Sequence, residues 1–371
     1  MIKSAYIHIP FCKTICSYCD FCKFFYNKEW INKYLDSLNY EIDTIYKNEY
    51  LDTIYVGGGT PNSLSDDELI KLLNILNKLN KNEVYEYTFE CNIEYITESQ
   101  LKILKEYGIN RLSIGVQTFN NDLLKLINRH HTKEEVYEKI SLAKRIGFNN
   151  INIDLIYALP NETLIDLKND LDNFLKLDIN HISTYALILE EHTMFSIKNI
   201  ENIDEELELK MYELIKETLK NNGFNHYEIS NFAKDNYESK HNLTYWNNNE
   251  YYGFGLGASA YINNKRITNT NILKDYFNHN FNPTVEEIND TLKLEYEFIL
   301  GLRKTKGINK ELFKNKYNKD INDIEIVNKL ISEKNLIDDG INVFIPEDKI
   351  YISNDILVRF IGDDNDEKWC F

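Results

Sequence analysis

The stretch that decides the fold is residues 6–19, which read YIHIPFCKTICSYC. A short apolar run comes first, and Cys12, Cys16 and Cys19 follow it within one short loop. Three thiolates at this spacing can each bind one iron of a [4Fe–4S] cluster, which leaves the fourth iron open for a ligand. Zinc is the alternative metal, but a structural zinc site usually takes a second pair of cysteines, and the two distant cysteines stand singly. The spacing therefore favours an iron–sulfur centre.

Length and composition exclude several classes of protein. The chain has 371 residues, 43% of them hydrophobic, with 42 Lys and Arg against 59 Asp and Glu, a net charge of −17. This composition is that of a globular protein, and its acidity disfavours nucleic acid as a partner. No apolar run is long enough to cross a membrane and no secretory signal opens the chain. Four cysteines within eleven residues and no signal indicate a reducing compartment, so we expect a cytoplasmic protein.

Short apolar runs alternate with amphipathic stretches along the first two thirds of the chain. The runs lie at residues 5–9, 53–56, 85–91, 111–116, 151–156, 181–187 and 227–230, and helical patterns at 66–79, 98–107, 133–146, 164–177 and 205–221. Alternating strands and helices predict repeated βα units around a parallel sheet. Six or seven such units favour a partial TIM-type (β/α)6 barrel over a flat doubly wound sheet. In both folds, ligands bind at the carboxyl ends of the strands.

Unusual residues fall at those strand ends. The run Gly57-Gly58-Gly59-Thr60-Pro61 follows the second predicted strand, Glu90 ends the third and Gln117 ends the fourth. Asp154 lies in the fifth strand and Ala186 in the sixth. We expect these residues, distant in sequence, to converge with the cysteines on one mouth of the barrel.

The pattern changes in the last part of the chain. We divide the sequence into a barrel at 1–235, a connecting segment at 236–283 and a smaller, mainly helical module at 284–371. The module is predicted to contain helices at 287–302, 310–317 and 324–333 and a hairpin of 341–345 with 349–352. This order is winged-helix-like, but 13 basic against 19 acidic residues favour packing or docking over DNA binding.

Four motifs together resemble a known family. They are the cysteine stretch continued through Asp20-Phe21, the glycine run at 57–61, SIGVQTF at 113–119 and HNLTYW at 241–246. The chain resembles radical S-adenosylmethionine (SAM) proteins of the oxygen-independent coproporphyrinogen oxidase superfamily, over nearly its whole length. The last motif and the Asp-Phe pair are similar to the haem chaperone branch of that superfamily.

The resemblance implies three cofactors: a [4Fe–4S] cluster, SAM and haem. It places SAM contacts at Tyr6, Tyr18, Gly58, Gly59, Thr60, Glu90, Gln117, Arg129, Asp154 and Ala186. The chemistry agrees, because an open iron can chelate the methionine end of SAM, and glycines allow the backbone to approach a ligand closely. Without a ligand, Arg129 would be an ordinary solvated helix charge, and His130 and His131 would be solvated residues at a helix start.

The resemblance also suggests where haem is bound. His241, Tyr245 and Trp246 form a compact polar and aromatic cluster that could ligate iron and stack on a porphyrin. The same cluster could instead pin a loop to the barrel, and both interpretations stay open.

Three departures from the family pattern bear on function. Phe21 stands where the oxidase branch carries its fourth cysteine, so Cys22 is interpreted as a packed free thiol. Ser259 replaces a family histidine, and the chain starts too close to Tyr6 for the N-terminal extension of the oxidase branch. Together with these departures, the resemblance implies a haem-binding chaperone that delivers haem to acceptor haemoproteins, in transient contact with membrane respiratory proteins. The alternatives are a coproporphyrinogen III oxidase, whose turnover we do not expect, and an iron–sulfur protein without SAM chemistry.

Overall fold

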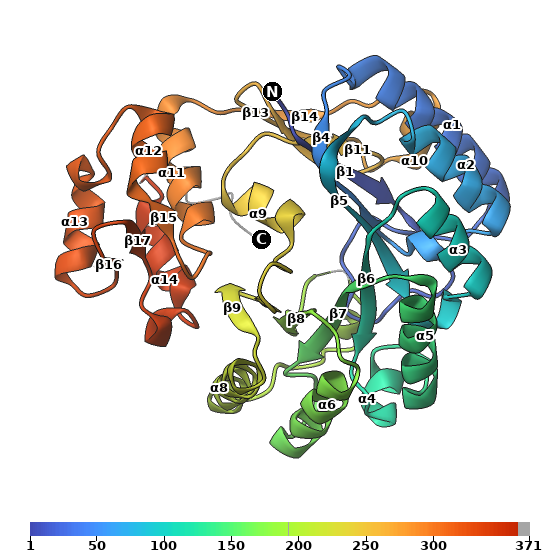
Figure 1. The fold of residues 1–371 in the computed structure, drawn as a ribbon, viewed down its shortest axis with the longest axis horizontal. Helices are drawn as coiled ribbons and strands as arrows, with labels where there is room; N and C mark the ends of the chain where they lie inside the picture. Colours follow the sequence, from blue (N-terminus) through green and yellow to red (C-terminus); the bar gives the residue numbers. More distant parts are fainter. Residues whose placement is uncertain (192, 363–371) are drawn as a thin grey trace.

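The computed structural model describes residues 1–191 and 193–362, and its main feature is a parallel sheet. Nine strands join in the order β11-β1-β4-β5-β6-β7-β8-β10-β9. Six of them run parallel to their neighbours and form the curved wall in Figure 1. They are β1 (Ser4–Ile9), β4 (Leu51–Gly58), β5 (Lys81–Asn92), β6 (Arg111–Gln117), β7 (Asn150–Tyr157) and β8 (His181–Ala186). The predicted α/β fold with six βα units is confirmed.

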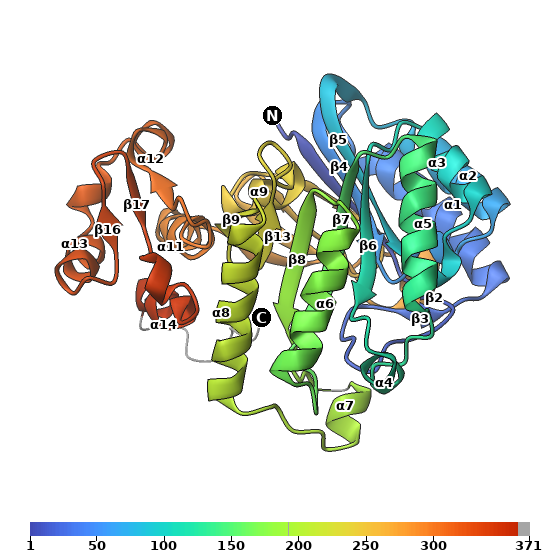
Figure 2. The ribbon, with the colours of Figure 1, turned by 60° about the horizontal axis from the view of Figure 1, so that its bottom comes forward.

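Helices cover the outer face of this sheet (Figure 2). They are α1 (Lys28–Ile45), α2 (Asp66–Leu76), α3 (Glu98–Glu106), α5 (Lys133–Ile146), α6 (Leu164–Lys176) and α8 (Glu205–Asn221). The short helices α4 (Asn121–Leu126) and α7 (Met194–Ile197) lie instead beyond the carboxyl ends of the strands, at the bottom of Figure 2. Ser65, Thr132 and Thr163 each begin a helix with a reciprocal capping box, which satisfies two otherwise unpaired backbone donors. These helices and their starting residues agree with the predicted βα pattern; the 18-residue helix α1 was not among the predicted helices.

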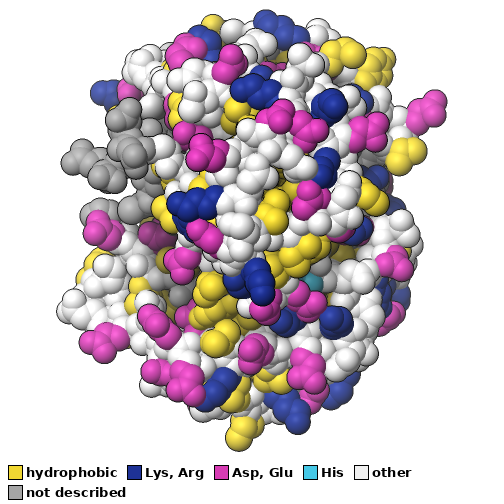
Figure 3. Space-filling view, turned by 90° about the vertical axis from the view of Figure 1, so that its left-hand side faces the viewer, with side chains coloured by type: hydrophobic (Ala, Val, Ile, Leu, Met, Phe, Trp, Pro, Cys, Tyr) yellow, Lys and Arg dark blue, Asp and Glu magenta, His cyan; other side chains and the backbone are white. Residues whose placement is uncertain are grey.

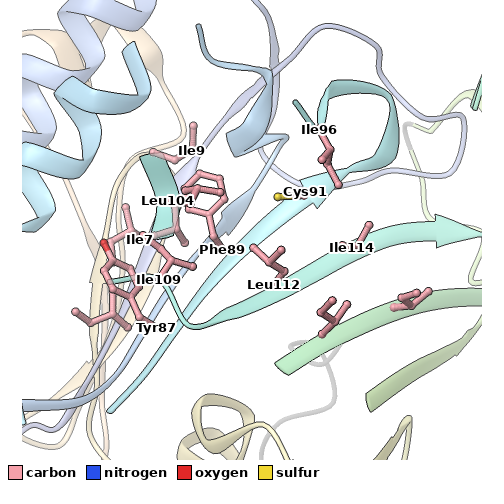
Figure 4. Packing of buried hydrophobic residues seen from close by; sticks show 14 of the residues in the cluster. Ile7, Ile9, Tyr87, Phe89, Cys91, Ile96, Leu104, Ile109, Leu112 and Ile114 are labelled. Carbon is pink, nitrogen blue, oxygen red and sulfur yellow. The ribbon is translucent and has the colours of Figure 1, made fainter. Parts of the chain in front are cut away.

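The two faces of the sheet differ in chemistry. Phe89 of β5 lies in register with Leu112 of β6, and both are fully buried against the helices. Figure 4 shows this apolar layer, in which Leu104 and Ile109 approach the strands from the helix side. The next residue on each strand, Glu90 and Ser113, faces the interior cavity instead. Along these strands, apolar side chains face the helices and polar side chains face the cavity. The cavity is therefore lined by groups that can bind a polar ligand.

The predicted seventh unit at 227–230 is wrong as a parallel strand. Strand β9 (Asn225–Glu228) pairs antiparallel with β10 (Asn231–Ala233), and β10 pairs antiparallel with β8. At the other edge of the sheet, β11 (Tyr252–Phe254) runs parallel to β1. The short turn between β9 and β10 leaves no room for the crossover helix that a parallel connection needs.

The middle of the chain connects the barrel to the C-terminal module. It contains helix α9 (Lys240–Trp246), helix α10 (Leu273–Phe277) and an antiparallel sheet of β12 (Ser259–Ile262), β13 (Lys265–Thr268) and β14 (Thr284–Glu287). Two-residue strands β2 (Phe11–Cys12) and β3 (Phe24–Phe25) flank the cysteine loop. The three-part division of the chain stays a prediction; the sheet β12–β13–β14 contains strands from both sides of residue 283.

The C-terminal module has its own apolar core and lies beside the barrel (Figure 1). Its elements are α11 (Asp290–Gly301), β15 (Ile308–Asn309), α12 (Lys310–Tyr317), α13 (Glu325–Ser332), β16 (Ile337–Asp338), β17 (Asn342–Phe344) and α14 (Ser353–Leu357). This order of helices and strands is winged-helix-like. The predicted strand at 349–352 is wrong: β17 pairs with β16 and β15, and the chain turns helical after residue 346.

The surface carries side chains of both charges (Figure 3). Figure 3 shows the face on the module side of the molecule, where acidic and basic side chains are interspersed. Among the described residues, no helix is long and apolar enough to cross a bilayer. Short 3-10 helices lie at Pro61–Ser63, Ile93–Tyr95, Ile321–Asp323, Glu347–Lys349 and Val358–Phe360.

Candidate functional site

One cavity of about 430 Å³ opens at the carboxyl ends of the parallel strands. The loop after β1 places Cys12, Cys16 and Cys19 on its wall. Cys12 is buried, whereas Cys16 and Cys19 are half-buried, and all three are free thiols. The structure thus brings the three predicted ligands to the predicted end of the barrel.

The surroundings of the cysteines suit an anionic cluster. The hydroxyl of Thr60 donates a hydrogen bond to Sγ of Cys12 at 3.3 Å, and Nη1 of Arg129 lies 4.0 Å from Sγ of Cys16. Within the described residues, no three side chains converge as the ligands of a single metal ion. A [4Fe–4S] cluster needs no such convergence because each cysteine binds a different iron. The donor set therefore fits a cluster better than a zinc ion.

Nine of the ten predicted SAM contacts line the same cavity. They are Tyr18, Gly58, Gly59, Thr60, Glu90, Gln117, Arg129, Asp154 and Ala186. The tenth, Tyr6, does not line it, and its hydroxyl is hydrogen-bonded to Nδ1 of His8 at 2.9 Å. The convergence of residues from five strands and three loops is the geometry that a ligand site at the mouth of a barrel requires.

The glycine run packs tightly against its own chain. A Cβ on Gly58 would lie 2.6 Å from the His8 ring, and a Cβ on Gly57 would lie 2.7 Å from the Glu90 carboxyl group. Gly58 also has a φ of +114°, which side-chain-bearing residues rarely adopt. The requirement for glycine at these two positions thus arises from contacts within the protein, in addition to the close ligand approach predicted from the sequence.

Glu90 is held in a defined position at the cavity. Its Oε1 accepts a hydrogen bond from the Tyr55 hydroxyl at 2.7 Å, and its Oε2 accepts one from the Gly58 amide at 3.0 Å. Burial raises the pKa of Glu90 to about 7. A carboxyl group with this pKa can accept hydrogen bonds from an ammonium or ribose hydroxyl and changes charge near neutral pH.

Arg129 is a buried residue, so the expectation of an ordinary solvated charge is wrong. Its side chain is 3% exposed, and Nη2 donates a hydrogen bond to the carbonyl oxygen of Gly115. Nε lies 3.7 Å from Oε1 of Glu94, which also contacts Nδ1 of His131 at 3.4 Å. His131 is buried, contrary to expectation, whereas His130 is exposed as predicted. Arg129 therefore presents a fixed positive charge beside the cysteines.

A hydrogen-bond network crosses the interior below the mouth. Asn152 donates to Ser113 and to Oδ1 of Asp154, both at 2.8 Å, and accepts from Ser183 at 3.1 Å. Burial raises the pKa of Asp154. Sequence reasoning missed Asn152, Ser113 and Ser183, and also Tyr55 and Arg111, which line the cavity too. The signal that could have found them is the alternation of polar and apolar residues along each strand.

The HNLTYW motif forms most of helix α9. His241 is buried, with Nδ1 2.8 Å from Oγ1 of Thr53 and Nε2 2.8 Å from the Tyr245 hydroxyl. Burial lowers the pKa of His241 to about 3. His241, Tyr245 and Trp246 do not line the cavity, whereas Asn242 of the same motif does. In this structure both ring nitrogens of His241 are occupied by protein partners.

Two residues at which the chain departs from the family pattern also have defined positions. Cys22 is half-buried outside the cavity lining and packs against the main core. Ser259 is exposed in β12, where its hydroxyl pairs with Oγ1 of Thr268 at 3.1 Å. Neither residue contacts the cavity, so the absence of a histidine at position 259 leaves the cavity wall unchanged.

Comparisons with known proteins agree with this geometry. Residues 6–174 match the model of the radical SAM superfamily, so the cavity and its cysteines belong to a radical SAM domain. The chain is 41% identical over 374 residues to the heme chaperone HemW of Lactococcus lactis, covering 98% of both chains. It is 40% identical over 379 residues to the heme chaperone HemW of Bacillus subtilis, covering 98% of this chain and all of the relative. The chain therefore belongs to the HemW family.

A solved structure extends the comparison of the fold. The coproporphyrinogen III oxidase HemN of Escherichia coli, described as a radical SAM enzyme, superposes with a TM-score of 0.85. The match covers 97% of this chain and 90% of that chain at 21% identity. The two proteins share their fold, including the C-terminal module, and the family resemblance inferred from the motifs is confirmed.

Proposed function

We propose that the protein is a cytoplasmic haem-binding chaperone that carries a [4Fe–4S] cluster and SAM and delivers haem to acceptor haemoproteins. The observation that carries this proposal is the similarity, over nearly the full length, to relatives named heme chaperone HemW. The convergence of three cysteines and nine predicted SAM contacts on one cavity supports the two cofactors.

The residues of the cavity have distinct roles in this proposal. Cys12, Cys16 and Cys19 hold three irons, and the positive charge of Arg129 offsets part of the charge of the cluster. A cluster bound there would supply an electron at short range to the sulfonium of SAM. Glu90 accepts hydrogen bonds from the polar end of SAM, and Asp154, two strands further along the sheet, offers a second acceptor.

The oxidase alternative is not favoured. The similarity to the E. coli oxidase is 21% in sequence, which supports a shared fold alone. Phe21 stands where the oxidase branch carries a cysteine and is 62% exposed at the cavity rim. We therefore expect no conversion of coproporphyrinogen III when cluster, SAM and an electron donor are all present.

Anaerobic reconstitution tests the chaperone proposal. The wild type should take up four irons and four sulfides, bind haem with a defined Soret band and pass it to an apo-haemoprotein. A Cys16→Ser variant is the matched control for the cluster. Turnover of coproporphyrinogen III would support the oxidase instead, and failure to bind haem with SAM binding intact would reject the chaperone.

We further propose that the α9 motif takes part in haem binding. Because Nε2 of His241 is bonded to Tyr245, iron ligation through that nitrogen requires the hydroxyl to move away. Tyr245→Phe frees Nε2 while keeping the ring, so it should preserve or strengthen haem binding if His241 is a ligand. His241→Ala should then change the Soret band. If both variants keep the wild-type Soret band and haem affinity, the motif is a structural link between α9 and β4.

A further inference from the structure

The floor of the cavity holds a buried cation with few partners. Arg111 is 2% exposed, begins strand β6 and lines the cavity. Its one hydrogen bond within the described residues runs from Nη1 to Oγ1 of Thr88, at 3.5 Å, and its Nε has no partner. A guanidinium group offers five N–H donors and cannot lose its charge in a protein. A buried guanidinium group with few hydrogen bonds lowers the stability of the fold unless a ligand or water accepts hydrogen bonds from its free donors.

The acidic side chains of the cavity do not pair with this cation. No salt bridge joins them within the described residues, although the charge of Arg111 partly offsets the rise that burial causes in the pKa of Glu90 and of Asp154. The carboxyl oxygens of Glu90 accept from Tyr55 and Gly58, and Oδ1 of Asp154 accepts from Asn152. The donors of Arg111 therefore remain available to a ligand in the cavity.

A second side chain completes the floor from another element. Asn242 of helix α9 lines the cavity, and within the described residues its side-chain amide has no hydrogen-bond partner. The helix that carries it is fixed, because Glu86 accepts hydrogen bonds from the backbone amides of Lys240 and His241, both at 3.1 Å. Both side chains line the same cavity, and a guanidinium can pair with a carboxylate through two parallel hydrogen bonds.

We infer that Arg111 and Asn242 form an anion subsite at the floor of the cavity, which receives a carboxylate group of a ligand. The subsite shares its cavity with the cysteines and the glycine run but uses different side chains. The carboxylate can come from a small free acid or from a propionate arm of haem, and the subsite itself does not depend on the haem proposal.

Propionate labelled with ¹³C at its carboxyl carbon is the direct probe. Its NMR signal should broaden and shift on binding to the wild-type protein. We expect at least a tenfold loss of affinity in Arg111→Gln, a smaller loss in Arg111→Lys and an intermediate loss in Asn242→Leu. Arg145→Gln, at an exposed arginine on α5, is the matched control and should bind like the wild type. Circular dichroism of each variant establishes that it is folded.

Haem and its dimethyl ester distinguish the two sources. If haem supplies the carboxylate, the wild type should prefer haem to the ester, and Arg111→Gln should lose that preference. If the wild type binds propionate but has the same affinity for haem as for the ester, the result would support the subsite and assign it to a small free acid. Folded Asn242→Leu and Arg111→Gln proteins that bind propionate as the wild type does, or a wild type that does not bind it, would overturn the inference. Failure of haem binding alone would reject the chaperone proposal and leave the propionate result standing.

Discussion

Replacing Gly58 by alanine should destabilise the protein and weaken SAM binding together. The new Cβ would lie 2.6 Å from the ring of His8. That ring cannot move freely, since Nε2 pairs with the carbonyl oxygen of Cys22 at 2.8 Å and Nδ1 with the Tyr6 hydroxyl. The φ of +114° adds backbone strain to the steric clash.

The magnitude can be worked from a matched glycine. Gly223 has a φ of +81° and nothing within 4 Å of an added Cβ, so Gly223→Ala measures backbone strain without a clash. We expect Gly223→Ala to cost about 1–2 kcal/mol in the free energy of unfolding. Gly58→Ala carries a similar strain and also loses one or two hydrogen bonds of His8, for a total of about 2–4 kcal/mol.

Denaturation measurements test the predicted loss of stability, and binding measurements test the predicted loss of SAM affinity. Urea unfolding of the two variants, followed by circular dichroism, gives the difference in stability. SAM titration of the reconstituted proteins should show weaker binding in Gly58→Ala only, because the Gly58 amide holds the carboxyl group of Glu90. The reasoning is refuted if Gly58→Ala costs no more than Gly223→Ala, or if both variants bind SAM as tightly as the wild type.

Three further predictions concern charge and the cluster. Cys16→Ser should lose the cluster absorption and the EPR signal of the reduced state, whereas Cys22→Ser should keep both; loss in both variants would make Cys22 a ligand. SAM affinity should rise as the pH increases through about 7, because Glu90 becomes charged, and a Glu90→Gln variant that keeps this pH dependence would contradict that role. Glu41 is buried, and burial raises its pKa from 4.5 to about 7. The folded state therefore binds the proton more tightly than the unfolded state, and the free energy of unfolding falls as the pH rises from 4.5 to about 7. Glu41→Gln should reduce this slope by about 1.4 kcal/mol per pH unit, measured by urea unfolding, and an unchanged slope would assign it to other groups.

Local patterns predicted much of the fold and of the cluster site. Helix α5 has its predicted bounds, since a capping residue and an apolar periodicity define a helix within the sequence itself. The cluster site could be predicted for the same reason, because Cys12, Cys16 and Cys19 lie within one short stretch of sequence. Helix α1 was missed although its signal was present: Ile31, Leu35, Leu38 and Ile42 repeat with helical spacing and are buried.

Long-range contacts could not be predicted in the same way. Thr53 and His241 are 188 residues apart, and nothing near either residue indicates that they pair. The sequence left a solvated position open for Arg129, because the burial of its side chain depends on contacts with Glu94 and with the loop that carries Cys16. The wrong strand at 349–352 has the same cause, because β17 finds its partners earlier in the chain, at β15 and β16.

The polar interior of the sheet holds the side chains of the site in defined positions. A barrel filled with Val, Ile and Leu is the usual stable solution, whereas this one places Glu90, Arg111 and Asp154 inside. Buried polar groups lower stability unless they are hydrogen-bonded. Asn152 provides much of that bonding, because it joins four neighbouring side chains. The network fixes the side chains around it, so a ligand loses less free energy to ordering them when it binds. The same inward positions that weaken the barrel therefore give it a preorganised site, and the donors of Arg111 that the network leaves unpaired are the ones a ligand can use.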